Sequence, residues 1–228
     1  RDRSPSRGLG DVYKRQVLVF AGLVICNEIA RRTKAGGVFF FLILPLALTV
    51  YFIVFAKEGI FFLSGDAYGN AVLPMQIIMP TLIFIGLTNV MGIQMLVPLG
   101  REKIVLYSEI AGAVVDLIVN FILIPRFASA GAAIGTLIAE IVVWIVQFGA
   151  LKNEIAPAYS KIQYPQMVVA LAIGCAASVW VKMLGWNSFF TLVLSAILFF
   201  GSYGLVLILT HEPLVLEIVN QIFVKVKK

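Results

Sequence analysis

Long apolar stretches separated by short polar connections dominate the chain after residue 37. Six of these stretches are close to the roughly 20 residues that a helix needs to cross the hydrocarbon core of a membrane. They cover residues 38–56, 73–99, 104–124, 130–151, 166–184 and 189–210. A shorter apolar run, residues 17–26, is interpreted as the stub of a preceding span. The pattern predicts an all-α, polytopic membrane helix bundle with six transmembrane helices and antiparallel neighbours.

Polar side chains recur at helical spacing inside two of the predicted spans. Each set shares one face of its helix because residues three, four or seven apart lie above one another. The candidate positions are Glu109, Asp116 and Asn120 in the third span, and Thr136, Glu140 and Gln147 in the fourth. The opposite face of the fourth span carries Gly131, Gly135 and Ala139, a small-residue seam that lets another helix approach closely.

The acidic members of these stripes are expensive at membrane depth, where an ionisable group costs several kcal/mol. One interpretation is that they line a cavity or couple transport to an ion. The alternative is that they are hydrogen-bonded packing groups or remain protonated. Asp116 and Glu140 are predicted to lie near the bilayer midplane on consecutive antiparallel helices. We therefore expect them to lie within reach of each other or to face one shared cavity.

Basic residues predict the orientation of the spans, because Lys and Arg accumulate in cytoplasmic loops. Alternate connections hold ten basic residues against three. The rich set is Arg31, Arg32, Lys34, Arg101, Lys103, Lys152, Lys161, Lys225, Lys227 and Lys228, and the poor set is Lys57, Arg126 and Lys182. Both termini are thus predicted to be cytoplasmic. Lys182 is expected to extend its ammonium toward the outer interface.

Composition supports a membrane protein. The chain is 61% hydrophobic and 13% charged, with a mean hydropathy of +0.98, whereas a soluble domain carries about 25% charged residues. The basic residues behind the net charge of +6 are scattered between apolar spans, so they predict no nucleic-acid partner. No catalytic, metal or cofactor motif is present in the sequence. Cys26 and Cys175 are isolated in apolar surroundings and are interpreted as packing residues.

The chain divides into four predicted segments. Residues 1–16 are polar and basic, resemble translated sequencing-adapter read-through, and are set apart from the fold; the alternative is a native disordered tail. Residues 17–37 hold the stub and a cytoplasmic basic segment. Residues 38–151 form four spans, and residues 152–228 add two spans with a basic cytoplasmic tail.

Three stretches carry a resemblance to a known family. They read FLSGDAYGNAVLPMQIIMP, GLTNVMGIQMLVPLGREK and VDLIVNFILIPRFASAGAAIGTLIAE. This run resembles the polysaccharide-biosynthesis flippases, including O-antigen translocases, of the multidrug/oligosaccharidyl-lipid/polysaccharide exporter superfamily. The resemblance covers about residues 27–151, and extends to the last two spans only by topology. An Asn is common in that family where Asp116 stands, whereas Asn120 fits the usual pattern.

The resemblance implies that the chain is part of the C-terminal lobe of a two-lobed flippase in a bacterial inner membrane, with about eight spans upstream. Such a protein moves undecaprenyl-diphosphate-linked oligosaccharide between leaflets by alternating access, beside a polysaccharide polymerase and a chain-length regulator. It is not an enzyme and uses no cofactor. The alternatives are a cation-coupled multidrug antiporter of the same superfamily and an integral-membrane glycosyltransferase or ligase. A further alternative is a non-transporting membrane assembly subunit, which would not need acidic residues at the midplane.

Overall fold

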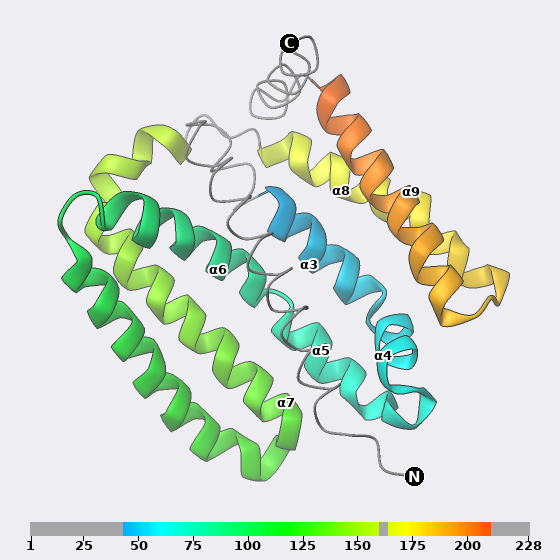
Figure 1. The fold of residues 1–228 in the computed structure, drawn as a ribbon, viewed down its shortest axis with the longest axis horizontal. Coiled ribbons are helices and arrows are strands. Elements are labelled where there is room, and N and C mark those ends of the chain that lie inside the picture. The colour runs from blue at the N-terminus through cyan, green and yellow to red at the C-terminus, as the bar shows by residue number, and fades with distance from the viewer. Residues whose placement is uncertain (1–42, 160–163, 211–228) are drawn as a thin grey trace, which may run out of the picture.

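The computed structural model describes residues 43–159 and 164–210 (Figure 1). Every regular element in these two ranges is a helix, so the all-α prediction is confirmed for the described residues. The leader, the stub, the N-terminal basic segment, the first residues of the first predicted span and the basic tail lie outside them.

The first predicted span is not one straight helix. Helix α3 (Leu44–Val54) begins with a proline in its first turn, where the missing N–H has no intrahelical role, and ends at Phe55, which leaves helical geometry with φ −103° and ψ 24°. Helix α4 (Ala56–Ser64) follows at once, bent by 76° from α3. Gly65 ends α4 with a φ of 88°, a conformation that favours glycine. The sequence predicted a short loop after residue 56, but that stretch is helical.

The second span is a series of short helices that run in one direction. They are η2 (Asp66–Ala71), α5 (Val72–Ile78), α6 (Thr81–Thr88) and the π-helix η3 (Asn89–Leu96). Pro80 separates α5 from α6, because proline lacks the N–H needed to continue the ladder. Together they make a 31-residue candidate for a membrane span, Asp66–Leu96.

Helix α7 (Glu102–Tyr159) is broken at Ala128, which has φ 47° and ψ −124°. Its apolar part, Glu102–Ile155, contains 54 residues. At 1.5 Å per residue a straight helix of that length would measure about 80 Å, against about 30 Å of hydrocarbon. Figure 1 instead shows two antiparallel arms joined at a tight turn, as the third and fourth predicted spans require.

The last part of the described chain is a second helical pair. Helix α8 (Tyr164–Val179) continues into η4 (Trp180–Leu184), which ends at Gly185 in the left-handed conformation. Helix α9 (Ser188–Leu209) then returns along α8. The corresponding membrane-span candidates, Pro165–Leu184 and Ser188–Leu209, match the predicted spans to within one residue at each end.

Helix α3 lies between two bodies (Figure 1). On one side, α5 and α6 pack against it and carry the α7 hairpin; on the other, α8 and α9 pack against it and against each other. The core on the second side gathers Tyr51 of α3 and Phe55 at the break with Phe199, Tyr203 and Leu207 of α9. Because lipid is as apolar as these side chains, close packing rather than burial from water holds such helices together.

By length and composition, four helices in the described residues can cross a membrane, or five if the bent α3–α4 pair is one span. The predicted total of six is reached only if the two arms of α7 are counted separately. The described part is therefore a helical protein with several candidate membrane spans.

Candidate functional site

The two arms of α7 meet along their small residues. A Cβ atom built on Gly112 would lie 2.5 Å from Val143 Cγ2, and one built on Gly131 would lie 2.5 Å from the Leu123 carbonyl oxygen. Neither position has room for a side chain. The predicted small-residue seam of the second arm is thus covered by the first arm.

Asp116 and Asn120 meet this seam at Gly135. A Cβ atom on Gly135 would overlap Asn120 Oδ1 and would lie 3.2 Å from Asp116 Oδ1. Both oxygen atoms are buried, and neither has a hydrogen-bond partner in the part of the chain that the structure describes. A buried polar atom without a partner costs about 1–3 kcal/mol. Two such oxygens directed at one glycine form the most unusual polar feature of the hairpin.

The other acidic candidates are less enclosed. Glu140 is partly buried on the second arm and Glu109 is exposed on the first, close enough for their charges to repel. Thr136 is partly buried one turn before Glu140. Within the described ranges no hydrogen bond joins Asp116 to Glu140, although the antiparallel register gives them similar depths. The pairing of Gly112 with Val143 and of Asn120 with Gly135 sets that register.

Gln147 lies where three elements meet. Its Nε2 donates to Ser108 Oγ of the first arm at 3.0 Å. Its Oε1 would lie 3.2 Å from a Cβ atom on Gly92 in the π-helix η3. That oxygen is buried without a partner in the described chain, as is the nearby Trp144 Nε1. Gln147 therefore joins the two arms by a hydrogen bond at the open end of the hairpin and packs against η3, so the polar stripe of the second arm is partly a packing surface.

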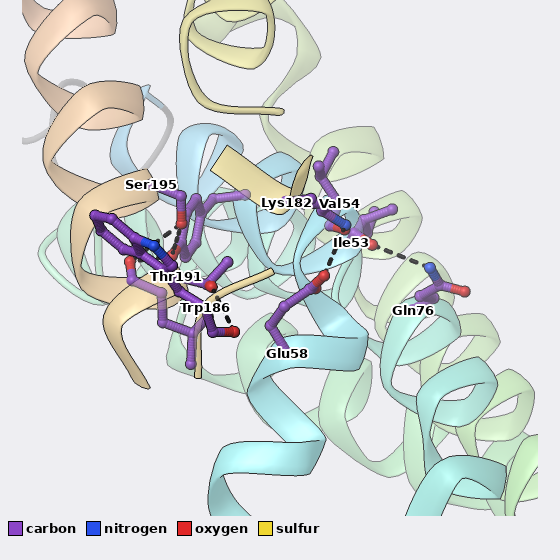
Figure 2. Close-up of polar contacts among 10 residues, drawn as sticks. Ile53, Val54, Glu58, Gln76, Lys182, Trp186, Thr191 and Ser195 are labelled. Carbon is purple, nitrogen blue, oxygen red and sulfur yellow. Dashed lines mark hydrogen bonds and ion pairs between the residues drawn. The ribbon is translucent and has the colours of Figure 1, made fainter. Parts of the chain in front are cut away.

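A second polar site lies at the break between α3 and α4, and the sequence did not indicate it. Lys182 of η4 donates from Nζ to the Val54 carbonyl at 2.6 Å. The same ammonium lies 3.3 Å from Glu58 Oε1 and 4.7 Å from the centre of the Phe55 ring. Figure 2 shows Lys182, Val54 and Glu58 together, with Gln76 of α5 donating to the neighbouring Ile53 carbonyl at 3.0 Å. Lys182 thus turns toward the break between α3 and α4.

One turn along α3, Tyr51 joins the same helix to α9. Its hydroxyl donates to the Leu192 carbonyl at 2.8 Å and lies 3.0 Å from Ser195 Oγ. Ser195 is fully buried in a stripe of every fourth residue of α9 that faces α3. The stripe is readable from the sequence, but the partner of each hydroxyl is not.

The described residues contain no group of three His, Cys, Asp or Glu side chains that could hold a metal ion. Asp116 and Asn120 supply two oxygen atoms, which suits a hard monovalent cation or a proton better than a tightly held transition metal.

Comparison with known proteins adds one match. Residues 11–62 match a family of unknown function, DUF5692. The part of this match that the structure describes contains α3 and most of α4, including the break and Glu58. No curated protein matches the chain. No solved structure matches it either.

Proposed function

We propose that this chain is part of a cation-coupled membrane transporter, and that Asp116 and Asn120 form its coupling site. The observation that carries the proposal is the pair of buried, unpartnered oxygens against Gly135. An ionisable side chain inside a membrane helix is a functional-site hypothesis by default. A cation between the two oxygens, or a proton on Asp116, would remove the cost of leaving them unpaired.

The proposed topology has six spans. The bent α3–α4 pair, the Asp66–Leu96 series, the two arms of α7, the α8–η4 helix and α9 would each cross once. The basic-residue bias then puts both termini in the cytoplasm and the exposed Asp66 outside. A cysteine at Asp66 should react with an impermeant maleimide added to intact cells, and labelling only after lysis would contradict this topology.

As the transported substrate we propose a lipid-linked oligosaccharide, on the strength of the sequence resemblance. The chain would supply one wall of a hydrated cavity. A diphosphate headgroup is anionic, so Asp116 and Glu140 would serve ion coupling rather than headgroup binding. The acidic hairpin also suits a second candidate, a multidrug antiporter that exports cations, because Glu109, Asp116 and Glu140 would attract them.

The coupling site is tested first on the chain itself in detergent or nanodiscs. We expect sodium, compared with choline at equal ionic strength, to stabilise the wild type. A ligand at a hundred times its Kd adds about 2.7 kcal/mol. Asp116→Asn should lose this gain, and Asp66→Asn, which changes an exposed acid, should keep it. If stability rises on acidification and not on addition of sodium, the coupling ion is a proton. No response to either cation would exclude the site.

The substrate is tested in proteoliposomes with the longer protein that we propose contains these residues. Fluorescent undecaprenyl-diphosphate oligosaccharide should move between leaflets, and Asp116→Asn with Glu140→Gln should slow it at least about tenfold, a barrier change of about 1.4 kcal/mol. Transport of a cationic dye instead would identify the antiporter. A double mutant with the wild-type rate would reduce both acids to packing residues.

A further inference from the structure

The break between α3 and α4 brings together the two charged ends of two helices. The last carbonyls of a helix have no intrahelical partner, and they carry the negative end of its dipole. At this break those carbonyls belong to Ile53 and Val54. The first turn of α4 carries the positive end of its own dipole, and Glu58 lies in that turn. An acid at one end and a cation at the other would stabilise both helices.

Lys182 supplies that cation from outside the broken helix. Its ammonium has three kinds of contact at once: a carbonyl at 2.6 Å, a carboxylate at 3.3 Å and the face of an aromatic ring at 4.7 Å. Carbonyl and carboxylate oxygens at an interrupted membrane helix are the groups that hold coupling cations in transporters. An aromatic face adds attraction for an organic ammonium.

The site is partly buried, and one oxygen of its carboxylate is unused. The side chains of Glu58 and Lys182 are 17% and 31% exposed. Glu58 Oε2 is buried and has no hydrogen-bond partner among the described residues. The carboxylate therefore has a free oxygen beside the ammonium, as a site that accepts a cation would.

We propose that the α3–α4 break is a cation-binding site whose resident occupant is the Lys182 ammonium. Through this tethered cation, η4 fastens the α8–α9 pair to the bent helix. The ligand class of the site is a primary ammonium or a monovalent metal ion. When Lys182 is absent, a free cation of this class takes its place between Val54 O, Glu58 and the Phe55 ring. The proposal does not depend on the Asp116 site, which lies in a different pair of helices.

The chain offers a matched control in Lys57. This lysine neighbours the break and lies over the Phe61 ring at 5.4 Å, but it is exposed and has no carbonyl or carboxylate contact among the described residues. Lys182→Met and Lys57→Met remove the same charge and one cation–π contact each. Only the first empties the proposed site.

The experiment measures the melting temperature of the full chain in detergent. Lys182→Met should lower it by about 5 °C, whereas Lys57→Met should change it little. Methylammonium, or sodium against N-methylglucamine, should restore at least half of the loss in Lys182→Met. Neither methylammonium nor sodium should raise the melting temperature of the double variant Lys182→Met, Glu58→Gln, because the carboxylate of the site is gone.

Several outcomes would overturn the proposal. One is an equal fall in melting temperature in Lys182→Met and Lys57→Met. Another is that no small cation raises the melting temperature of Lys182→Met. The third is that a small cation raises the melting temperature of the double variant as much as that of Lys182→Met. If Lys182→Met fails to fold, Lys182→Arg and Glu58→Gln decide. Arg keeps the charge and should stay near the wild type, while Glu58→Gln should fall. An Arg variant as unstable as Glu58→Gln would show that size, and not cation binding, sets the role of Lys182.

Discussion

The α7 hairpin and the α3–α4 break handle polar groups in opposite ways. In the hairpin the backbone is helical on both sides of Ala128, yet the side-chain oxygens of Asp116, Asn120 and Gln147 are buried without partners in the described chain. At the break the backbone is interrupted, yet the Ile53 and Val54 carbonyls each accept a side-chain hydrogen bond. The free oxygen there, Glu58 Oε2, belongs to a carboxylate that already pairs with the Lys182 ammonium.

The difference separates two causes of polarity inside an apolar protein. An interrupted helix exposes carbonyls that must find donors, and the side chains around the break supply them. A regular helix has no such need, so polar side chains on it serve some other purpose. We therefore read the break as a structural joint with a built-in cation, and the hairpin as a place prepared for a ligand.

The largest expected effect comes from filling the gap between the arms of α7. Gly135→Val should cost about 3 kcal/mol, because any Cβ there overlaps Asn120 Oδ1 and crowds Asp116 Oδ1. Gly149→Val is the control: it lies in the same arm, is exposed and has nothing within 4 Å. The two variants share the helix-propensity penalty of valine, so the difference in unfolding free energy reports the close approach. Equal losses would show that the arms separate easily at Gly135.

The next effect compares two glutamines, one at each region. Gln76→Leu should cost about 1–2 kcal/mol, because it leaves the Ile53 carbonyl without its donor. Gln94→Leu, in the π-helix beside the hairpin, should be neutral or stabilising, because its Nε2 is buried without a partner in the described chain. Denaturant unfolding of both variants in the same detergent gives the comparison. A larger loss of unfolding free energy in Gln94→Leu than in Gln76→Leu would mean that the Gln94 amide stabilises the fold.

Much of the fold was predictable because long apolar stretches indicate helices that can span a membrane. The last two spans agree closely with the structure, and the Asp116–Asn120 stripe, four residues apart, places both side chains on the face toward the second arm. These features follow from the helical period of 3.6 residues and from the length of an apolar stretch. Both can be read from one continuous segment of the sequence.

The break was not predictable in the same way. Phe55 and Ala56 carry no helix-breaking signal, and the charged Lys57 and Glu58 read as the start of a loop after a span that ends at residue 56. Lys182, which donates to the Val54 carbonyl at the bend, is 128 residues away from it and reaches it only in the folded chain. Likewise, the hydrogen bonds from Gln76 to the Ile53 carbonyl and from Tyr51 to the Leu192 carbonyl join different helices. Helical spacing within one segment cannot indicate such contacts.

The smallest expected effect concerns the second ion pair among the described residues. Arg101 Nη1 lies 3.1 Å from Glu154 Oε1, joining the start of one arm of α7 to the end of the other. Their side chains are 44% and 38% exposed, against 31% for Lys182 and 17% for Glu58. Solvent screening limits such a pair to about 0.5 kcal/mol.

A double-mutant cycle of Arg101→Ala and Glu154→Ala should therefore give a coupling energy that disappears in high salt. The cycle of Lys182→Met and Glu58→Gln should keep most of its coupling under the same conditions, because that pair is more buried and the ammonium is also held by the Val54 carbonyl. Two couplings of equal size and equal salt dependence would contradict the distinction between an exposed clamp on the hairpin and a more buried cation at the break. If only the Lys182–Glu58 coupling energy persists in high salt, burial of the pair, and not charge alone, stabilises the contact at the break.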